Sequence, residues 1–477
     1  MEQDQGGNRQ PAGTFSLVST TNGTPLRPGT PNTDRNPFGD DRIEPQGSQQ
    51  VGGLNPFTSP SVSRPASSFD SSSALGGPPR GQRYFHSRRV KGDIEKPWLA
   101  KVDPKEKWVT ILPIIGIFVG LAISGVLIWD GLRSVVKHKY CVVLEDNFET
   151  FNTDVWTKEV QVGGFGNGEF EQTTNTDENV YVENGHLFIK PTLQDAALIN
   201  KDTLINLLED GSCTSKQYYD CVAATNTTAG NSTIVPPTKS GRINTRKGAS
   251  IKYGRVEVVA KLPEGDWLWP AIWMLPVDET YGPWPISGEI DILESRGNNR
   301  SYAQGGNNIA SSALHWGPDV ANDAWWRTNV KREALHTTYS AGFNTFGLEW
   351  SQKYLFTYVN SRLLQVLYTN FDQYLWDRGN FPAANSNGTR LEDPWSQTGR
   401  KNTPFDQKFY LILNVAVGGT NGWFEDSKSG KPWLDASANA KKDFWQAQDS
   451  WYPTWKNPAM EVEKVSMWQQ CDGNEEL

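Results

Sequence analysis

The sequence predicts an all-β domain of the sandwich or barrel class that follows one transmembrane helix and a disordered N-terminal tail. Three observations support this prediction. After about residue 141, short segments rich in Val, Ile, Tyr, Phe and Trp alternate between apolar and polar positions and are separated by Gly, Asn, Pro and Asp, a pattern typical of strands and turns. Residues 108–129 form an uncharged apolar run, and residues 1 to about 90 are dense in Gly, Pro, Ser, Asn and Gln.

Five segments show the strand pattern most clearly. They are "HLFIKPTL" (186–193), "GRVEVVAKLP" (254–263), "FGLEWSQKYLFTYVNSRLLQVL" (346–367), "KFYLILNVAVGG" (408–419) and "MEVEKVSMWQQ" (460–470). Only residues 203–210 and 436–448 favour helix. Many spaced strands with turn residues between them indicate a sandwich or barrel. The sequence contains no internal repeat, which argues against a propeller.

The apolar run 108–129 is 22 residues long, enough to cross a hydrocarbon core of about 30 Å as a helix. Residues 88–107 carry seven Lys or Arg, whereas residues 130–149 carry three. Because the more basic flank stays in the cytosol, we predict a single-pass type II membrane protein. Residues 1–107 would form a disordered cytosolic tail, and residues 130–477 would lie in the lumen of the secretory pathway or outside the cell. The net charge of −8 argues against a nucleic-acid partner.

All four cysteines follow the apolar run, on the side where disulfides persist. Three pairings are open from the sequence; we favour Cys213 with Cys221 and Cys141 with Cys471, and four free thiols are the alternative. Sequons for N-glycosylation occur on the same side, at Asn226, Asn231, Asn299 and Asn387.

Three acids lie within six residues of an otherwise apolar strand in "GPWPISGEIDILESRGNN" (282–299), namely Glu289, Asp291 and Glu294. Strict alternation would place Glu294 on the opposite face from the other two. A β-bulge near Ile292 or Leu293 would return it to their face. Two carboxyls about 5–5.5 Å apart can then cleave a glycosidic bond with retention, and one of them should keep a proton through a raised pKa. The alternatives are a solvated sheet face or a calcium site.

The sequence around these acids resembles glycoside hydrolase family 16, in particular its laminarinase-like branch, which has a bulged Glu-x-Asp-x-x-Glu strand. The whole chain resembles a fungal-type, membrane-anchored member of this family. The resemblance runs from about Leu144 to Gln470. Further matching motifs are "GNGEFEQTTN", "WPAIWMLP", "ALHWGP", "FGLEWS" and "ILNVAVGG". The resemblance implies a concanavalin A-like β-jelly roll with a cleft across its concave sheet. It also implies that Glu289 is the nucleophile, Glu294 the acid/base and Asp291 their modulating partner.

The same resemblance suggests which side chains hold the substrate. Trp269 and Trp273 match sugar-stacking tryptophans, and His315 matches a histidine near the reacting sugar, with a core role as the alternative for each aromatic. Four weaker candidates for the cleft are Asn167, Glu169, Trp350 and Trp423. The insert from about 195 to 240 could form a lid or a cleft wall.

We therefore expect a membrane-tethered retaining endo-glycosidase of cell-wall polysaccharide, acting on β-1,3 or mixed β-1,3/1,4 glucan by hydrolysis or transglycosylation. The alternatives are a non-hydrolytic glucan-binding receptor and a scaffold for assembly of wall glucan. The expected partners are β-glucan and, through one helix, a membrane. No cofactor or catalytic metal is expected, although a structural Ca²⁺ ion would be compatible with the fold.

Overall fold

A computed structural model describes residues 88–100, 103–134, 138–228 and 233–471. Most of the predicted tail, up to residue 87, and the sequon at Asn231 lie outside the described residues. The chain divides into two compact units, 1–102 and 103–477. In the described part of the first unit, a short helix α1 spans Pro97–Ala100.

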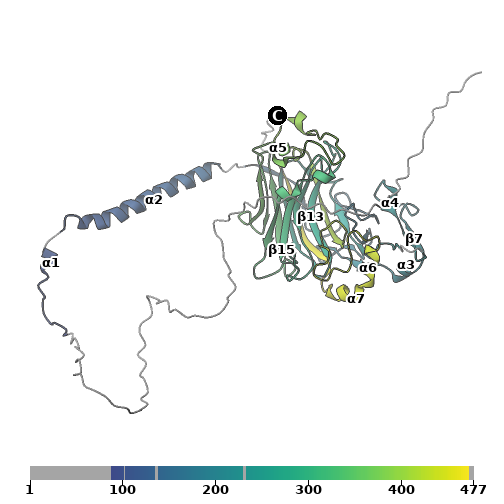
Figure 1. The fold of residues 1–477 in the computed structure, drawn as a ribbon, viewed down its shortest axis with the longest axis horizontal. Coiled ribbons are helices and arrows are strands. Elements are labelled where there is room, and N and C mark those ends of the chain that lie inside the picture. The colour runs from purple at the N-terminus through teal and green to yellow at the C-terminus, as the bar shows by residue number, and fades with distance from the viewer. Residues whose placement is uncertain (1–87, 101–102, 135–137, 229–232, 472–477) are drawn as a thin grey trace, which may run out of the picture. The chain divides into compact units, whose positions relative to one another are not determined.

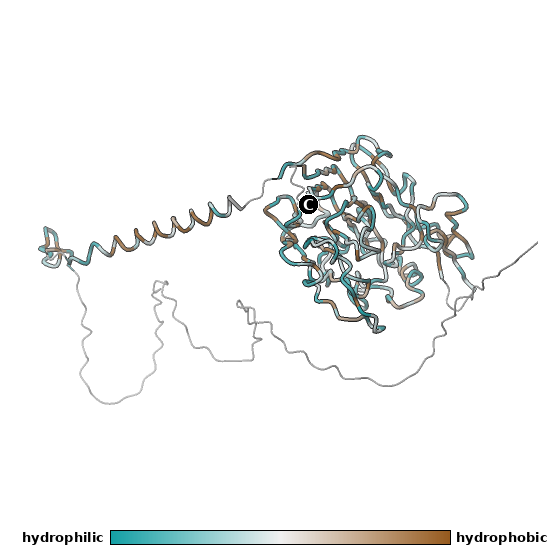
Figure 2. The backbone as a smooth tube through the Cα atoms, turned by 90° about the horizontal axis from the view of Figure 1, so that it is seen from above, coloured by the Kyte–Doolittle hydropathy of each residue, from teal (hydrophilic) through white to brown (hydrophobic). Residues whose placement is uncertain are grey.

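The predicted membrane span lies within helix α2 (Glu106–Ser134). Its stretch Glu106–Gly131 is long and apolar enough to cross a bilayer, and none of it is buried against the rest of the protein. Figure 2 shows hydrophobic residues along the length of this helix. Helices that pack in a soluble core bury one face, so this exposure agrees with a membrane span. The orientation of the helix stays a prediction.

Two large antiparallel sheets make up the domain that follows α2, which we call the outer domain after its predicted side of the membrane. The first sheet has the order β19 (Gln365–Asn370), β18 (Tyr354–Val359), β17 (Asn344–Trp350), β12 (Gly254–Lys261), β21 (Met460–Gln470), β5 (His186–Ile189) and β4 (Val180–Glu183), with β1 (Tyr140–Asp146) also paired to β21. The second sheet has the order β16 (Asn329–Glu333), β15 (Ile309–His315), β14 (Glu289–Glu294), β13 (Leu268–Pro276), β20 (Phe409–Val417), β10 (Arg242–Asn244) and β2 (Thr157–Lys158), with β11 (Ser250–Ile251) beside β20.

Smaller elements surround the two sheets. A third sheet contains β3 (Glu171–Thr173), β9 (Thr238–Ser240) and β6 (Thr192–Leu193), and a hairpin joins β7 (Thr203–Asn206) to β8 (Val222–Thr225). The short helices are α3 (Ala196–Asn200), α4 (Tyr218–Cys221), α5 (Leu375–Gly379), α6 (Ala440–Gln446) and α7 (Gln448–Trp451), with 3-10 turns at Val320–Asn322, Trp325–Arg327, Ser396–Thr398 and Tyr452–Thr454. Helices α5 and α7 lie at opposite ends of the sandwich in Figure 1.

The main core fills the space between the two large sheets. Strand β12 alternates as expected, with Val256, Val258 and Ala260 buried and the intervening residues partly exposed. All nine residues of β20 are buried, because its second face is covered as well. The antiparallel β-sandwich predicted from the sequence is confirmed.

The five predicted strand segments are all strands in the structure. Of the two predicted helices, residues 436–448 contain α6, whereas the prediction for residues 203–210 is wrong. These residues begin with β7, which pairs along its whole length with β8. Leu207, just after the strand, packs with Val160, Val162 and Cys221, so tertiary pairing overrides a weak local helix preference.

Both favoured disulfides form in the structure, Cys141 with Cys471 and Cys213 with Cys221. The first joins residues 330 positions apart in the sequence, and the second joins residues eight apart. Strand β1 pairs with the last strand, β21, from Tyr140 to Asp146. The two ends of the outer domain are therefore held together by both a strand pairing and a covalent bond.

Candidate active site

The predicted bulge is present in strand β14. Against the neighbouring β13, Asp291 lies opposite Trp273 and Leu293 lies opposite Ile272, so Ile292 is the extra residue. The hydroxyl of Ser312 donates to the carbonyl of Ile292 at 2.7 Å, which satisfies a backbone group that the bulge removes from regular pairing.

The bulge places the three acids on one face of the second sheet. Glu289 lies opposite His315 on β15, Asp291 opposite Ala313 and Glu294 opposite Ser311. The intervening Ile290, Ile292 and Leu293 are buried in the core on the other side. The strand thus anchors its apolar side chains between the sheets and presents its carboxyls together.

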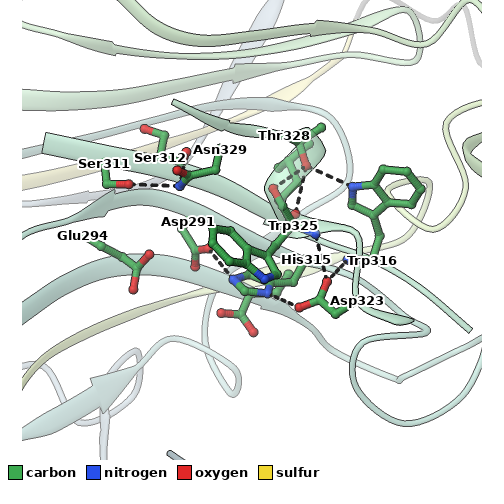
Figure 3. Close-up of polar contacts among 12 residues, drawn as sticks. Asp291, Glu294, Ser311, Ser312, His315, Trp316, Asp323, Trp325, Thr328 and Asn329 are labelled. Carbon is green, nitrogen blue, oxygen red and sulfur yellow. Dashed lines mark hydrogen bonds and ion pairs between the residues drawn. The ribbon is translucent and has the colours of Figure 1, made fainter. Parts of the chain in front are cut away.

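Glu289 and Glu294 each accept a hydrogen bond from an indole, and Asp291 has an ion-pair partner. The indole of Trp284 donates to Glu289 at 2.6 Å, and the indole of Trp269 donates to Glu294 at 3.1 Å. Nε2 of His315 lies 3.2 Å from Oδ2 of Asp291. Figure 3 shows Asp291 between Glu294 and the imidazole of His315. Two indole donors and one ion pair therefore hold three carboxyls that would otherwise repel one another.

Burial controls the protonation of this group. It raises the pKa of Glu289 to about 8, with a further contribution from the charge of Asp291. Burial also raises the pKa of Glu294 to about 7. Burial opposes a charge on His315, but hydrogen bonds to Asp291 and Asp323 prevail and hold the pKa of the imidazole well above its ordinary value. Between about pH 7 and 8 the two glutamates therefore share roughly one proton, and the higher pKa of Glu289 places that proton mainly on Glu289. The roles expected from the sequence require it on Glu294 instead.

The acids open into a cleft of about 920 Å³. Most of the predicted site residues line it, namely Asn167, Trp269, Trp273, Glu289, Glu294, His315 and Trp423. The indoles of Trp269 and Trp423 stack with their centroids 4.7 Å apart and their planes 12° apart. The guanidinium of Arg296 lies 3.9 Å from the ring of Trp423. On another part of the cleft wall, Trp273 donates to Asn414 and lies beneath Arg242.

Three of the predicted residues do not line the cleft. Asp291 is buried and contacts His315, which does line it. Trp350 is wrong as a cleft residue: it lies at the end of β17 in the first sheet, is fully buried, and donates to the carbonyl of Phe405 at 3.1 Å. Its indole packs edge-on against Tyr253 and Phe409 in the core. Glu169 is also buried and does not line the cleft. It accepts a hydrogen bond from Asn167 at 2.9 Å, so it supports a cleft residue from behind.

Several residues of the site were not predicted from the sequence. Trp284 lies five residues before Glu289 in the same acidic segment and donates to it, so its position in the sequence is a signal for this contact. Asp323 and Trp325 belong to the segment 316–328 after β15, which has no periodic pattern. Arg296 is buried close to Glu294 and has its pKa lowered, mainly by burial, to about 10.

The acceptor atoms of Glu289, Asp291 and His315 all lie within 4.8 Å of one another, close enough to surround a cation. The distance between His315 and Asp291 is that of a hydrogen bond, and the other imidazole nitrogen faces Asp323. A metal ion would have to break the first of these contacts. The geometry therefore favours a proton-linked group of side chains over a metal site.

Comparison with known proteins shows which sequences the chain is similar to. Residues 209–392 match the model of glycosyl hydrolases family 16. The chain is 39% identical over 344 residues to a beta-1,3-glucan-binding protein of Penaeus monodon, covering 69% of this chain and 90% of that protein. It is 31% identical to glucan endo-1,3-beta-glucosidase A1 of Niallia circulans, covering 58% of this chain and 33% of that protein.

Among solved structures, the laminarinase from Rhodothermus marinus aligns with a TM-score of 0.44 and 24% identity, covering 71% of this chain and all of that one. The relative from Penaeus monodon shares enough sequence over nearly its whole length to assign the family. The chain belongs to glycosyl hydrolase family 16.

Proposed function

We propose that the outer domain is a retaining endo-glucanase that cleaves β-1,3-linked or mixed β-1,3/1,4-linked glucan. The observation that carries this proposal is the bulged strand, which presents Glu289 and Glu294 to the cleft and keeps the buried Asp291 on the same face of the sheet. In the first step, the carboxylate of Glu289 attacks the anomeric carbon while the carboxylic acid of Glu294 protonates the departing oxygen. In the second step, Glu294 takes a proton from water, which displaces Glu289.

The cleft has features that suit a chain of sugars. Its volume of about 920 Å³ lies at the upper end of the range for small-molecule sites, which favours binding of several rings and attack within a chain.

A second function, glucan binding without turnover, is favoured by the names of the relatives. The matching proteins of Penaeus monodon and Tenebrio molitor are both called beta-1,3-glucan-binding proteins. Stacked indoles such as Trp269 and Trp423 would serve a binding protein as well as an enzyme. The raised pKa values of Glu289 and Glu294 favour the enzyme, because a protonated buried acid beside an ionisable one is what glycoside cleavage needs.

Incubation of the full-length chain, purified in detergent, with laminarin distinguishes these functions. The wild type should release shorter oligosaccharides. Glu289→Gln and Glu294→Gln should each slow release by a factor on the order of 10³ or more while laminarin binding persists. Glu279→Gln provides a matched control, since Glu279 lines the cleft outside the catalytic group.

Products longer than the donor would identify transglycosylation, and the anomeric configuration of the first product tests the retaining mechanism. If no variant or wild type changes the substrate while all bind it equally, the protein is a glucan-binding protein and the enzymatic proposal is wrong.

We further propose that α2 anchors the protein with the outer domain on the lumenal or extracellular side. The two disulfides and the exposed apolar helix support this placement, since disulfides persist mainly in oxidising compartments. The sequons at Asn226, Asn299 and Asn387 have exposed asparagines. A loss of apparent mass after glycosidase treatment, together with protease sensitivity of an N-terminal tag in sealed microsomes, would support this topology. A protected tag would reverse it.

A further inference from the structure

The imidazole of His315 lies between two carboxylates. Nε2 is 3.2 Å from Oδ2 of Asp291, and Nδ1 is 2.5 Å from Oδ2 of Asp323. His315 is the last residue of β15, and Asp323 belongs to the segment 316–328 that follows it. Figure 3 shows the three side chains in a row, joined by dashed lines. Asp291 therefore has a second acid behind its histidine partner.

Carboxylates accept hydrogen bonds and do not donate them when ionised. A neutral imidazole has one donor and one acceptor nitrogen, so it could satisfy only one of the two acids. An imidazolium carries a hydrogen on both nitrogens, so Nδ1 can donate to Asp323 while the positive charge at Nε2 pairs with Asp291. The contacts of His315 thus fit the charged form, in which one positive charge lies between two negative ones.

Asp323 is itself held in place by the backbone. Its Oδ1 accepts from the amide of Trp316 at 3.1 Å and from the amide of Trp325 at 3.2 Å. These two bonds leave Oδ2 directed at His315. The indole of Trp325 is inclined by 27° to the imidazole, with centroids 6.4 Å apart, and both side chains line the cleft.

We propose that Asp323 is a positioning residue that keeps His315 charged, so that a fixed cation lies beside Asp291 and Glu289 at every working pH. This inference rests on the proposed glycosidase function. The charged groups that act on His315 are Glu289, Asp291 and Glu294 from β14 and Asp323 from the following segment. Without Asp323, the imidazole loses its proton at lower pH and the charge of Asp291 faces Glu289 uncompensated.

The consequence for the reaction concerns the nucleophile. Glu289 must be ionised to attack, and the charge of His315 lowers its pKa. When Glu289 bonds to the sugar, its negative charge disappears, and His315 still balances Asp291. Because the positive charge of His315 lowers the pKa of Glu289, loss of that charge should raise the pKa of Glu289, and Glu289 should ionise only at higher pH. In this scheme Asp323 acts through His315 and does not touch the substrate.

The first test measures the charge of His315 directly. The full-length chain in detergent, labelled only at its five histidines, is titrated by NMR from pH 5 to 9, and the His315 signal is assigned by its absence in His315→Gln. In the wild type we expect a charged imidazole throughout. In Asp323→Asn, which keeps the shape and acceptor oxygen of the side chain, we expect the imidazole to lose its proton within this pH range.

The second test is the pH dependence of kcat/KM on laminarin. Asp323→Asn should move the acid limb to higher pH by about one unit, which is a tenfold loss on that limb. Asp319→Asn is the matched control: Asp319 lies in the same segment and accepts from the amide and side chain of Asn322. It should leave the profile unchanged.

Two results would overturn the proposal. One is a wild-type His315 that titrates near 6.5, which decides the matter even if Asp323→Asn does not fold. The other is a uniform loss of rate in Asp323→Asn with unmoved limbs and a charged His315, which would indicate a purely structural role. Because the NMR measurement needs no turnover, a protein that binds glucan without cleaving it would still yield an answer.

Discussion

Removal of the disulfide between Cys141 and Cys471 should destabilise the outer domain more than removal of the disulfide between Cys213 and Cys221. In the double variant Cys141→Ser/Cys471→Ser, strand β1 can still pair with β21 along its whole length. The folded structure is thus expected to change little. The main effect should arise in the unfolded chain, which gains freedom when its two ends are released.

The size of the effect follows from the length of chain that each bond closes. The chain-entropy relation gives about 6 kcal/mol for a separation of 330 residues and about 2.5 kcal/mol for a separation of 8. The difference of about 3.3 kcal/mol depends only on the ratio of the two lengths. For a domain of roughly 330 residues, these values correspond to losses of about 8 °C and 4 °C in Tm.

Thermal and urea denaturation of the full-length chain in detergent, followed by tryptophan fluorescence, would measure both variants against the wild type. The variant Cys213→Ser/Cys221→Ser serves as the matched control, because it also removes one disulfide and two sulfur atoms. Equal losses in the two variants would refute the entropic reasoning. A larger loss in the control would show that the hairpin of β7 and β8 contributes more to stability than the closure of the domain.

Three further predictions concern the cleft and the core. Trp423→Ala removes one of two stacked indoles and should weaken laminarin binding about tenfold, or ~1.4 kcal/mol; calorimetry showing unchanged affinity would make this residue structural. Trp350→Phe should lower the free energy of unfolding by about 1–2 kcal/mol, because the carbonyl of Phe405 loses its donor, and should leave KM unchanged; a raised KM would contradict its place in the core. Hydrolysis should fall below about pH 7, where the raised pKa values of Glu289 and Glu294 leave both protonated and no nucleophile ionised. It should also fall above about pH 8, where neither is an acid, and a pH–rate profile that is flat from 5 to 9 would exclude this pair.

The strands could be predicted because alternation of apolar and polar residues is a local property of the chain. The bulge could be predicted from chemistry, since only an extra residue near Ile292 brings Glu294 to the face of Glu289. The position of Trp350 could not be predicted in this way. Alternation shows that the residues of β17 point to two faces, but it does not show which sheet contains the strand or which face meets the core.

The partners of His315 illustrate a second limit. Asp291 precedes it on a neighbouring strand, and Asp323 follows it in an irregular segment. No spacing rule connects acids that lie on either side of a histidine across a strand pairing and a turn. Their contact depends on the backbone path from Gly317 to Thr328, which the side-chain pattern of the sequence does not encode.

The raised pKa of Glu289 also affects the stability of the folded protein, and this effect distinguishes a catalytic role of Glu289 from a structural one. Burial and the charge of Asp291 raise the pKa of Glu289 from 4.5 to about 8, so the ionised form is disfavoured in the folded state. Protonated Glu289 makes a contribution to folded-state stability that is fully present below about pH 4.5 and is lost as pH rises through about 8. A shift of this size corresponds to at most about 5 kcal/mol, and partial exposure of Glu289 to solvent reduces it.

Glu289→Gln removes the titrating group but keeps an oxygen that can accept from the indole of Trp284. We therefore expect the variant to be more stable than the wild type at pH 8 to 9 and nearly equal to it at pH 5, while turnover is lost. Urea denaturation at both pH values would measure this, with Glu279→Gln as the control. A residue that opposes stability is retained where its chemistry is needed. If Glu289→Gln is less stable at both pH values, Glu289 serves mainly as a structural partner of Trp284, and the binding function gains support.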